Sequence, residues 1–288
     1  MFTIKKVGEN YIIIIPMYSN NKIIKFMPYL NKILYDNNVD WVVLSNSLKN
    51  IEGIQESIYK ANINILNGKI IKENMILKIL EYISKVMKLE INQLDITVLV
   101  NNNKARNLKI ILNLAENVKT IKLVTNNEEK FKALEEKMQE IMGILLRITN
   151  NKRKGLAKEN IIINMDFSEE SLNKYTINSN AIIINMQGGT KIRSKRFNGI
   201  TVNDVNLRIP VNYKLQFARE NIYYDFEAKE LYEASIYYLD FEVAQKKINK
   251  DYIYIDSLVG NSGIINDKEF EEKCKIYVKT IDKTKIFD

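Results

Sequence analysis

The sequence predicts an α/β protein with a doubly wound, parallel sheet, preceded by a small α/β domain and followed by a helix-rich C-terminal extension. Two observations carry this prediction. Short apolar runs rich in β-branched residues alternate with segments of helical periodicity between residues 95 and 186. These runs show little apolar–polar alternation, which is typical of strands covered on both faces of a parallel sheet.

The N-terminal domain is expected to span residues 1–90 and to contain three short strands. Residues 72–89 have apolar residues at helical spacing, and we interpret this segment as the helix that connects to the next domain. Within the domain we expect strands at 11–17, 39–45 and 62–66, and helices at 21–38, 52–60 and 72–89.

The middle domain, residues 91–204, has the clearest pattern of the chain. Strands and helices alternate here without a repeat or a low-complexity segment. We expect strands at 95–100, 120–125, 143–148, 160–165 and 181–186, and helices at 103–116, 127–141 and 168–174.

The C-terminal extension, residues 205–288, carries no motif that we can interpret. Residues 225–249 combine apolar positions with many acids and tyrosines, which suggests one long helix or two. Residues 252–270 look like a strand, a glycine-containing turn and the start of a helix.

Composition limits the classes of protein to which the chain can belong. Its 288 residues suffice for two domains, and the apolar content of 46% is ordinary for a soluble globular protein. The longest apolar run, YIIIIPM, is too short to cross a bilayer, and no signal peptide opens the chain. A single cysteine, Cys274, excludes an internal disulfide framework and fits a reducing compartment. We therefore expect a cytoplasmic protein that does not contact membranes.

The formal charge of +8 could indicate a nucleic-acid partner. Asparagine, lysine and isoleucine are all abundant, as in proteins from AT-rich genomes, and the lysines are mixed with acids along most of the chain. Composition therefore explains the charge better than nucleic-acid binding does. The chain also contains no histidine, which removes the commonest general base and metal ligand, so we expect no metal site.

The stretch ITVLVNNNKARNLKIIL predicts a buried strand, a tight turn and a helix. In a Rossmann domain, glycines in this turn let the backbone approach the pyrophosphate of a dinucleotide. Asn101, Asn102 and Asn103 stand there instead, followed by Lys104. Asparagine tolerates the backbone of such a turn, but its side chain would crowd a pyrophosphate. We expect a Rossmann-like scaffold in which NAD(P) binding is weak or lost, although a smaller anion could bind at the start of the helix.

The next strand ends in Thr125 and Asn126, where a Rossmann protein usually has an acid for the ribose or a basic residue for a 2′-phosphate. Two basic clusters, 150–158 and 191–196, follow other strands of the sheet, so a small anionic ligand is a candidate partner. Asp166 is expected to cap the helix that opens at Ser168.

The order of the segments resembles the shikimate dehydrogenase family over roughly residues 10–200. IIIIPMYSNNKIIKFMPYLNKILYDNNVDWVV resembles the opening of that family, in which serines hold the substrate carboxylate. Ser19 is the one serine of that pair that remains, and the resemblance implies that it binds substrate. The histidine that the family has in this region is absent.

The turn and the following strand carry the resemblance further. VLVNNNKARNLKIILNLAENVKTIKLVTNNEEKFKALEEKM is similar to the family's strand, Gly-Ala-Gly-Gly-Ala-Arg turn, helix and Asn-Arg-Thr loop. Ala105 and Arg106 match the Ala-Arg of the turn. NIIINMDF is similar to the family's Ile-Ile-Asn-Ala-Thr-Pro strand end, with Asp166 and Phe167 in place of the Thr-Pro. The resemblance thus implies Asn101–Asn103, Lys104, Arg106, Thr125 and Asn126 as cofactor-binding positions.

The family also uses a lysine and an aspartate at the substrate hydroxyl. NINILNGK could match the first of these motifs, which makes Lys69 the candidate catalytic lysine, or the second, which places Asn67 where the aspartate belongs. An amide cannot accept the proton that a carboxylate accepts. Lys49 is an alternative to Lys69.

Three hypotheses for the function follow. The first is a degenerate, shikimate-dehydrogenase-like protein without dehydrogenase activity that senses or binds a small ligand or a nucleotide. The second is an NAD(P)-dependent oxidoreductase with a glycine-free phosphate turn, and the third is a nucleic-acid-associated factor that uses the basic loops. We also consider a homodimer.

Overall fold

The structure is a computed structural model that describes residues 3–7, 10–15, 20–210 and 225–273. The chain forms two compact units. The first unit comprises residues 1–71, 209–239 and 247–253, and the second comprises 72–208, 240–246 and 254–288. None of the described helices has the length and hydropathy that crossing a membrane requires.

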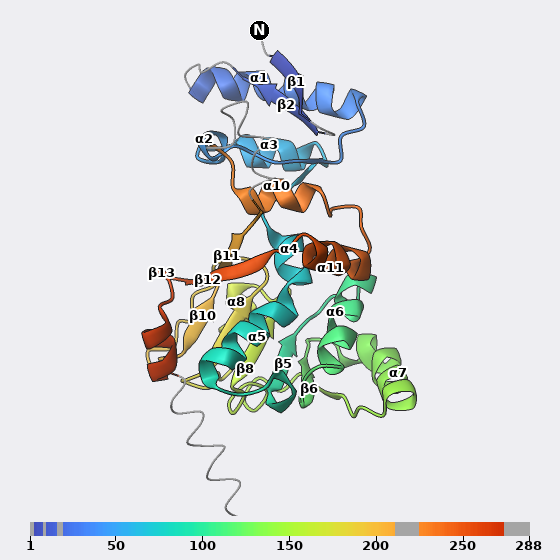
Figure 1. Cartoon of the computed structure of the whole chain (residues 1–288), viewed down its shortest axis with the longest axis vertical. Helices are drawn as coiled ribbons and strands as arrows, with labels where there is room; N and C mark the ends of the chain where they lie inside the picture. Colours follow the sequence, from blue (N-terminus) through green and yellow to red (C-terminus); the bar gives the residue numbers. More distant parts are fainter. Residues whose placement is uncertain (1–2, 8–9, 16–19, 211–224, 274–288) are drawn as a thin grey trace, which may run out of the picture. The chain divides into compact units, whose positions relative to one another are not determined.

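The second unit is built on a six-stranded, entirely parallel sheet (Figure 1). Its strand order is β10-β9-β8-β5-β6-β7. When the six strands are numbered 1 to 6 along the chain and the sheet is read from β7 to β10, this is the order 3-2-1-4-5-6 of a Rossmann domain. The strand order confirms the predicted fold class. The strands are β5 (Asp95–Leu99), β6 (Thr120–Val124), β7 (Arg147–Thr149), β8 (Ile161–Asn164), β9 (Ile182–Asn185) and β10 (Ile200–Val202).

Successive residues of each strand are buried on opposite faces of this sheet. In β8, Ile161 and Ile163 belong to the larger core, whereas Ile162 belongs to a second core with Phe167 and Tyr175. The larger core also contains the apolar sides of α5 (Ile76–Met87), α6 (Ala105–Ala115) and α7 (Lys132–Met142). Because both faces are covered, most positions of the strands are apolar and the runs lack a regular alternation.

Two predicted helices of this unit are interrupted. The segment 72–89 forms α4 (Lys69–Asn74) and α5, which are separated by Met75. The segment 127–141 forms a 3₁₀ turn, η2 (Glu128–Phe131), followed by α7. Gly143 ends α7 in the left-handed conformation, with φ of +64°, so β7 begins several residues later than its apolar run suggests.

Buried asparagines link the carboxyl ends of neighbouring strands. Asn164 of β8 donates to Asn185 of β9 over 3.1 Å, and Asn185 donates to Asn203 over 2.8 Å. Asn203 in turn donates to Asn261 over 2.6 Å. The side chain of Asn164 also bonds both the N–H and the carbonyl of Phe167. This asparagine ladder therefore fixes the chain where β8, β9 and β10 end.

The C-terminal part of the chain contributes to both units. Segment 225–249 contains two helices, α10 (Ala228–Ala234) and α11 (Phe241–Lys250). A strand follows as expected, β12 (Tyr254–Gly260), which turns into β13 (Gly263–Ile264). β12 pairs antiparallel with both β13 and β11 (Asp204–Arg208). Residues 225–249 thus contain two helices, one of the two arrangements expected from the sequence.

The first unit contains two small sheets, and four of the described helices lie wholly within it. β1 (Thr3–Val7) and β2 (Asn10–Ile14) form an antiparallel pair. β3 (Trp41–Val42) and β4 (Asn64–Ile65) form a parallel pair, shorter than the predicted strands. Around them lie α1 (Asn20–Asp36), α2 (Asn46–Lys49), α3 (Ile54–Lys60) and α10, and the core is formed mainly by α1, α3 and the β3–β4 region.

Candidate functional site

The strand order of the second unit reverses between β5 and β8. Ligands of open α/β sheets bind beyond the carboxyl ends of the strands at such a switch point. Residues 100–104 leave β5 here and lead into α6, while residues 165–168 leave the adjacent β8. The structure therefore brings the asparagine turn next to the segment that contains Asp166.

The carboxylate of Asp166 bonds the backbone of the asparagine turn. The N–H of Asn101 donates to one of its oxygens over 2.7 Å, and the N–H of Asn102 donates to the other over 2.8 Å. The expected capping role is wrong, because Ser168 caps α8 (Glu169–Leu172) through its own side chain. Asp166 instead places its own negatively charged carboxylate against the backbone of the turn.

The side chain of Asn101 links the carboxyl ends of β5 and β6 through hydrogen bonds. Its carbonyl oxygen accepts from the N–H of Asn126 over 2.8 Å and from the hydroxyl of Thr125 over 3.4 Å. Thr125 is fully buried, and its hydroxyl accepts from the N–H of Asn127. The position that a ribose occupies in a Rossmann domain is thus bridged by the chain itself.

The other predicted cofactor-binding residues bond within the protein. Asn102 accepts from the N–H of Lys104 over 3.0 Å, and Asn103 donates to the carbonyl of Lys130 over 3.4 Å. Arg106 lies in the first turn of α6 and contacts Glu73 of α4 over 2.7 Å. The Glu73 side chain is 7% exposed, so this ion pair is largely buried.

These contacts do not fit a dinucleotide bound in the ordinary Rossmann manner. The N–H groups of Asn101 and Asn102, which would face the pyrophosphate, already bond a carboxylate. A bound pyrophosphate would also lie against the negative charge of Asp166. Among the described residues, no cluster of acidic, cysteine or histidine side chains could hold a metal ion that would offset this charge.

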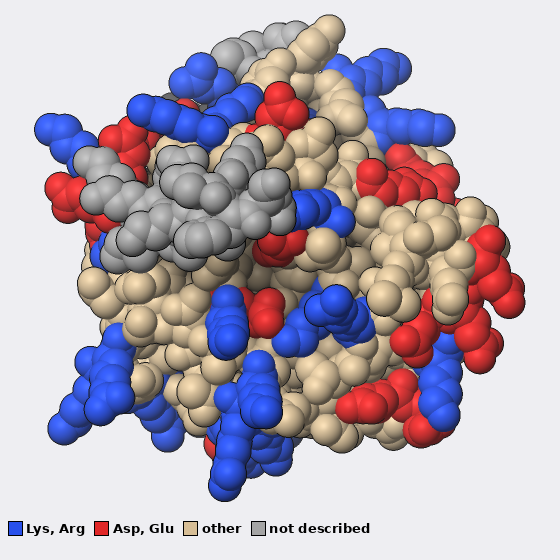
Figure 2. Space-filling view, turned by 90° about the horizontal axis from the view of Figure 1, so that it is seen from below, with Lys and Arg blue, Asp and Glu red and all other residues tan. Residues whose placement is uncertain are grey.

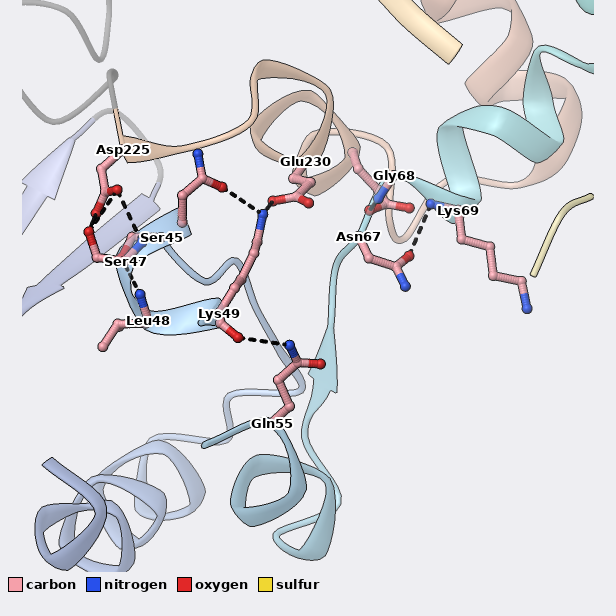
Figure 3. A network of polar contacts seen from close by, with 12 residues as sticks. Ser45, Ser47, Leu48, Lys49, Gln55, Asn67, Gly68, Lys69, Asp225 and Glu230 are labelled. Carbon is pink, nitrogen blue, oxygen red and sulfur yellow. Dashed lines mark hydrogen bonds and ion pairs between the residues drawn. The ribbon is translucent and has the colours of Figure 1, made fainter. Parts of the chain in front are cut away.

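A second polar network lies at the carboxyl ends of β3 and β4 in the first unit (Figure 3). The ammonium group of Lys49, on α2, contacts the Glu230 carboxylate over 2.6 Å and donates to Asn46 over 3.2 Å. Ser47 contacts Asp225 through both its N–H and its hydroxyl. Ser45 caps α2. Two acids that precede or lie within α10 are therefore bound by α2.

Glu233, also on α10, binds the chain that follows β4. Its carboxylate accepts from the N–H of Gly68 over 2.7 Å and from the N–H of Ile70. Gly68 has φ of +82°, a conformation that favours glycine. Glu233 is 1% exposed, so the two N–H groups provide the hydrogen bonds that a buried carboxylate requires.

The structure separates the two candidate lysines. Lys49 lies in the network with Glu230, whereas the side chain of Lys69 extends away from both (Figure 3). Asn67 accepts from the N–H of Lys69 over 3.2 Å. Burial raises the pKa of the Glu230 carboxyl above its usual range, and the ammonium group of Lys49 opposes this rise. Ser19, the candidate substrate-binding residue, lies outside the described residues.

The sequence analysis missed the roles of Asp166, Glu230 and Glu233. The position of Asp166 directly after a strand was a usable signal, because the Rossmann strand order places that strand beside the asparagine turn. The two glutamates had no such signal, since Glu230 lies 181 residues from Lys49 in the sequence.

The basic clusters are partly neutralised by neighbouring acids. In the 191–196 cluster, Glu169 accepts from the N–H of Lys191 and from the side chain of Arg193. The N–H of Lys191, and then Arg193, lower the pKa of the Glu169 carboxyl. On the face shown in Figure 2, basic side chains are interrupted by acids and by uncharged surface.

Comparisons with known proteins find solved structures of low sequence identity and low TM-score. No protein-family model matches the sequence, and no curated protein matches it significantly. The chain is similar to the A chain of dipicolinate synthase from Bacillus subtilis, with 12% identity over 74% of this chain and 65% of that chain, and a TM-score of 0.35. This chain thus spans less than two thirds of that protein.

Two dehydrogenase structures give similar values. L-tryptophan dehydrogenase from Nostoc punctiforme is 11% identical over 84% of this chain and 68% of that chain, with a TM-score of 0.33. A chorismate mutase/shikimate 5-dehydrogenase fusion protein from Clostridium acetobutylicum is 17% identical over 81% of this chain and 85% of that chain, with a TM-score of 0.25. Likenesses at this level carry no functional argument, and the Rossmann-like fold is assigned from the strand order of the sheet itself.

Proposed function

We propose that this chain is a degenerate relative of the shikimate dehydrogenase family that has kept a Rossmann scaffold without dehydrogenase activity. In this proposal it serves as a sensing or interaction protein for a small ligand or a nucleotide. One observation carries the proposal: the Asp166 carboxylate bonds the N–H groups of Asn101 and Asn102, at 2.7 and 2.8 Å.

Energetics favour this contact over a bound cofactor. Hydrogen bonds to a charged group stabilise a protein by about 1.5–3 kcal/mol each, and the Asp166 contact contains two of them. A pyrophosphate would have to replace both bonds and would leave the Asp166 carboxylate beside a second anion. The bridge from Asn101 to Asn126 adds a further contact that an adenosine ribose would displace.

The network in the first unit gives further support. The resemblance implies a lysine and an aspartate at the substrate hydroxyl, but NINILNGK can match only one of the two positions, with either Lys69 or the amide of Asn67. Lys49 bonds a buried carboxylate on α10. In our proposal this ion pair is structural and holds α10 against α2.

The same ion pair favours a second candidate, an NAD(P)-dependent oxidoreductase with a glycine-free turn. A buried carboxylate of raised pKa beside a lysine is an arrangement that acid–base catalysis uses. Glu230 would then provide the carboxylate that Asn67 lacks. This candidate requires that the unaltered protein binds a nicotinamide cofactor, whereas the first candidate does not.

A cofactor titration separates the two candidates. NADPH and NADH are added to the purified protein and to the Asp166→Ala variant, and cofactor fluorescence and melting temperature are followed. We expect no micromolar binding by the unaltered protein and at least tenfold tighter binding by Asp166→Ala, because the two N–H groups become accessible. Glu140→Gln, which removes an exposed acid on α7 of the same unit, should behave like the unaltered protein.

The opposite result is equally clear. Micromolar NADPH binding by the unaltered protein, abolished by the bulky substitution Asn102→Trp, would contradict the proposal and establish the oxidoreductase candidate. If Asp166→Ala melts at a much lower temperature, the titration is repeated with Asp166→Asn, which keeps one acceptor oxygen for the turn.

A further inference from the structure

A polar cavity of about 420 Å³ lies on the β6–β7 side of the sheet's carboxyl edge. Three segments line it, and each directly follows a strand of the sheet: one after β6, one after β7 and one that includes α8 after β8. Its lining residues are Asn126, Asn150, Lys152, Ser171, Lys174 and Tyr175. Cavities of this size hold small organic ligands in other proteins.

The charge of this cavity wall is positive. Lys152 and Lys174 are exposed lysines on two different segments of the wall. Lys174 also contacts Glu170, one turn earlier on α8, over 3.2 Å. The Glu170 side chain is 79% exposed, so this ion pair contributes little and leaves Lys174 able to bind an anion from the cavity.

Tyr175 is the second, independent observation that points to a ligand. It is 6% exposed, and its hydroxyl oxygen is buried without a hydrogen-bond partner among the described residues. Its ring packs edge-to-face against Phe167, with the ring centroids 5.8 Å apart, so the side chain is fixed in place. Buried hydroxyls without a partner are uncommon because each costs free energy.

The hydroxyl of Tyr175 is a hydrogen-bond donor at neutral pH. Burial raises the pKa of this tyrosine above its usual range, so the hydroxyl keeps its proton. Lysine ammonium groups, asparagine amides and the Ser171 hydroxyl are donors as well. A wall that consists of donors with two positive charges favours a ligand with several acceptor oxygens and a negative charge.

We propose that this cavity binds a small phosphomonoester through its phosphate group, with Lys152 and Lys174 as the cationic contacts and the Tyr175 hydroxyl as a donor. The proposal names a ligand class for the ligand-binding role proposed above and rests on that role. The N–H groups of the asparagine turn that bond Asp166 do not line this cavity, although Asn126 of its wall bonds Asn101.

The test is a titration with inorganic phosphate and, in a second arm, with adenosine 5′-monophosphate, at constant ionic strength set with sodium chloride. Isothermal calorimetry and melting temperature are measured for the full chain. We expect saturable binding, weakened about tenfold or more in Lys152→Gln/Lys174→Gln, since a charge-assisted contact is worth that factor or more. Glu170→Gln should bind more tightly, because Lys174 loses its competing partner.

Tyr175→Phe gives a readout that a merely structural tyrosine would not give. Because its hydroxyl has no partner in the protein, the variant should melt at the same temperature as the unaltered protein, or higher, when phosphate is absent. It should gain less stability on addition of phosphate. Lys137→Gln on α7 and Tyr254→Phe on β12 are matched controls from the same unit, and both should behave like the unaltered protein.

Two results would overturn the proposal. One is the absence of saturable phosphate or nucleotide binding. The other is binding that is equal in the Lys152→Gln/Lys174→Gln variant and the Lys137→Gln control. Either result would leave the NADPH titration of Asp166→Ala unaffected, so a failure of this site can be distinguished from a failure of the proposed function. Stronger binding of the nucleotide than of phosphate would indicate that the organic group also contacts the cavity.

Discussion

Glu230 and Glu233 lie one turn apart on α10 and bind different kinds of partner. Glu233 is bonded by two backbone N–H groups at the start of α4, and Glu230 is bonded by the side chain of Lys49. Glu233 is 1% exposed and Glu230 is 4% exposed, so water cannot supply the hydrogen bonds that these carboxylates require. At the residue scale, the first unit therefore depends on two buried acids from the C-terminal part of the chain.

The raised pKa of Glu230 predicts a dependence of stability on pH. A folded-state pKa above the ordinary value of 4.5 means that the native protein holds this proton more tightly than the unfolded chain does. The free energy of unfolding contributed by Glu230 is therefore complete below pH 4.5 and decreases as the pH rises through the folded-state value. Relative to Glu230→Gln, the unaltered protein should lose stability over that range.

Urea unfolding at a series of pH values from about 4 to 8 measures this difference. Glu52→Gln, an exposed acid of the same unit, is the control and should run parallel to the unaltered protein. A stability of the unaltered protein that rises relative to Glu230→Gln as the pH increases would contradict the prediction.

At the scale of the elements, the asparagine ladder connects the carboxyl ends of neighbouring strands through side-chain hydrogen bonds. β8, β9 and β10 are mostly apolar on both faces, and the hydrogen bonds of the ladder link the positions where these three strands end. Asn185 lies in the middle of the ladder and is fully buried.

Asn185→Ala should destabilise the second unit strongly. The substitution leaves the amide of Asn164 and the carbonyl oxygen of Asn203 each with one bond fewer, at a cost of about 1–3 kcal/mol per buried group. Far-UV circular dichroism in urea measures the loss. Asn198→Ala removes an exposed asparagine from the same unit and should change stability by less than about 0.5 kcal/mol; an equal effect of the two substitutions would show that the ladder contributes nothing.

Much of the second unit could be predicted at the element scale from local pattern. Runs such as IIIN, bounded by helical segments, fix the strands of a covered parallel sheet. Helix capping did not predict the Asp166 contact. Asp166 lies 65 positions from Asn101 and 64 from Asn102 in the sequence, and these residues meet only because β8 lies beside β5. In the first unit β3 and β4 are only two residues long, and Glu230, which binds Lys49 in its polar network, comes from α10, far along the chain.

The whole chain has two compact units with separate cores. The core of the second unit is much larger, so we expect it to be the more stable of the two. Trp41, the one tryptophan of the sequence, belongs to the first unit and packs against Tyr237.

Unfolding should therefore occur in two steps. Tryptophan fluorescence should report a lower urea midpoint than far-UV circular dichroism, which reports both units. Replacing Trp41 with phenylalanine removes the fluorescence signal and serves as the control for its origin. Coincident transitions by both methods would show that the units unfold together.

The formal net charge is +8, and on the face shown in Figure 2 the basic side chains are interspersed with acids and uncharged surface. We therefore expect no tight binding to a DNA duplex or to single-stranded RNA at about 150 mM salt. Fluorescence anisotropy of a labelled oligonucleotide measures this. Binding that weakens steeply with salt would instead support the nucleic-acid hypothesis, with Lys152→Gln and Arg196→Gln as the first variants to compare.

The Asp166 contact has a consequence for how the protein could change over time. A ligand that needs the turn can bind only the fraction of molecules in which Asp166 has swung away, and its apparent dissociation constant is the intrinsic value divided by that fraction. If one molecule in about a hundred is open, affinity falls about a hundredfold without any change in the shape of the turn. A single nucleotide change at codon 166 would lift that handicap, so the N–H groups of the turn lie one mutation away from an anionic ligand.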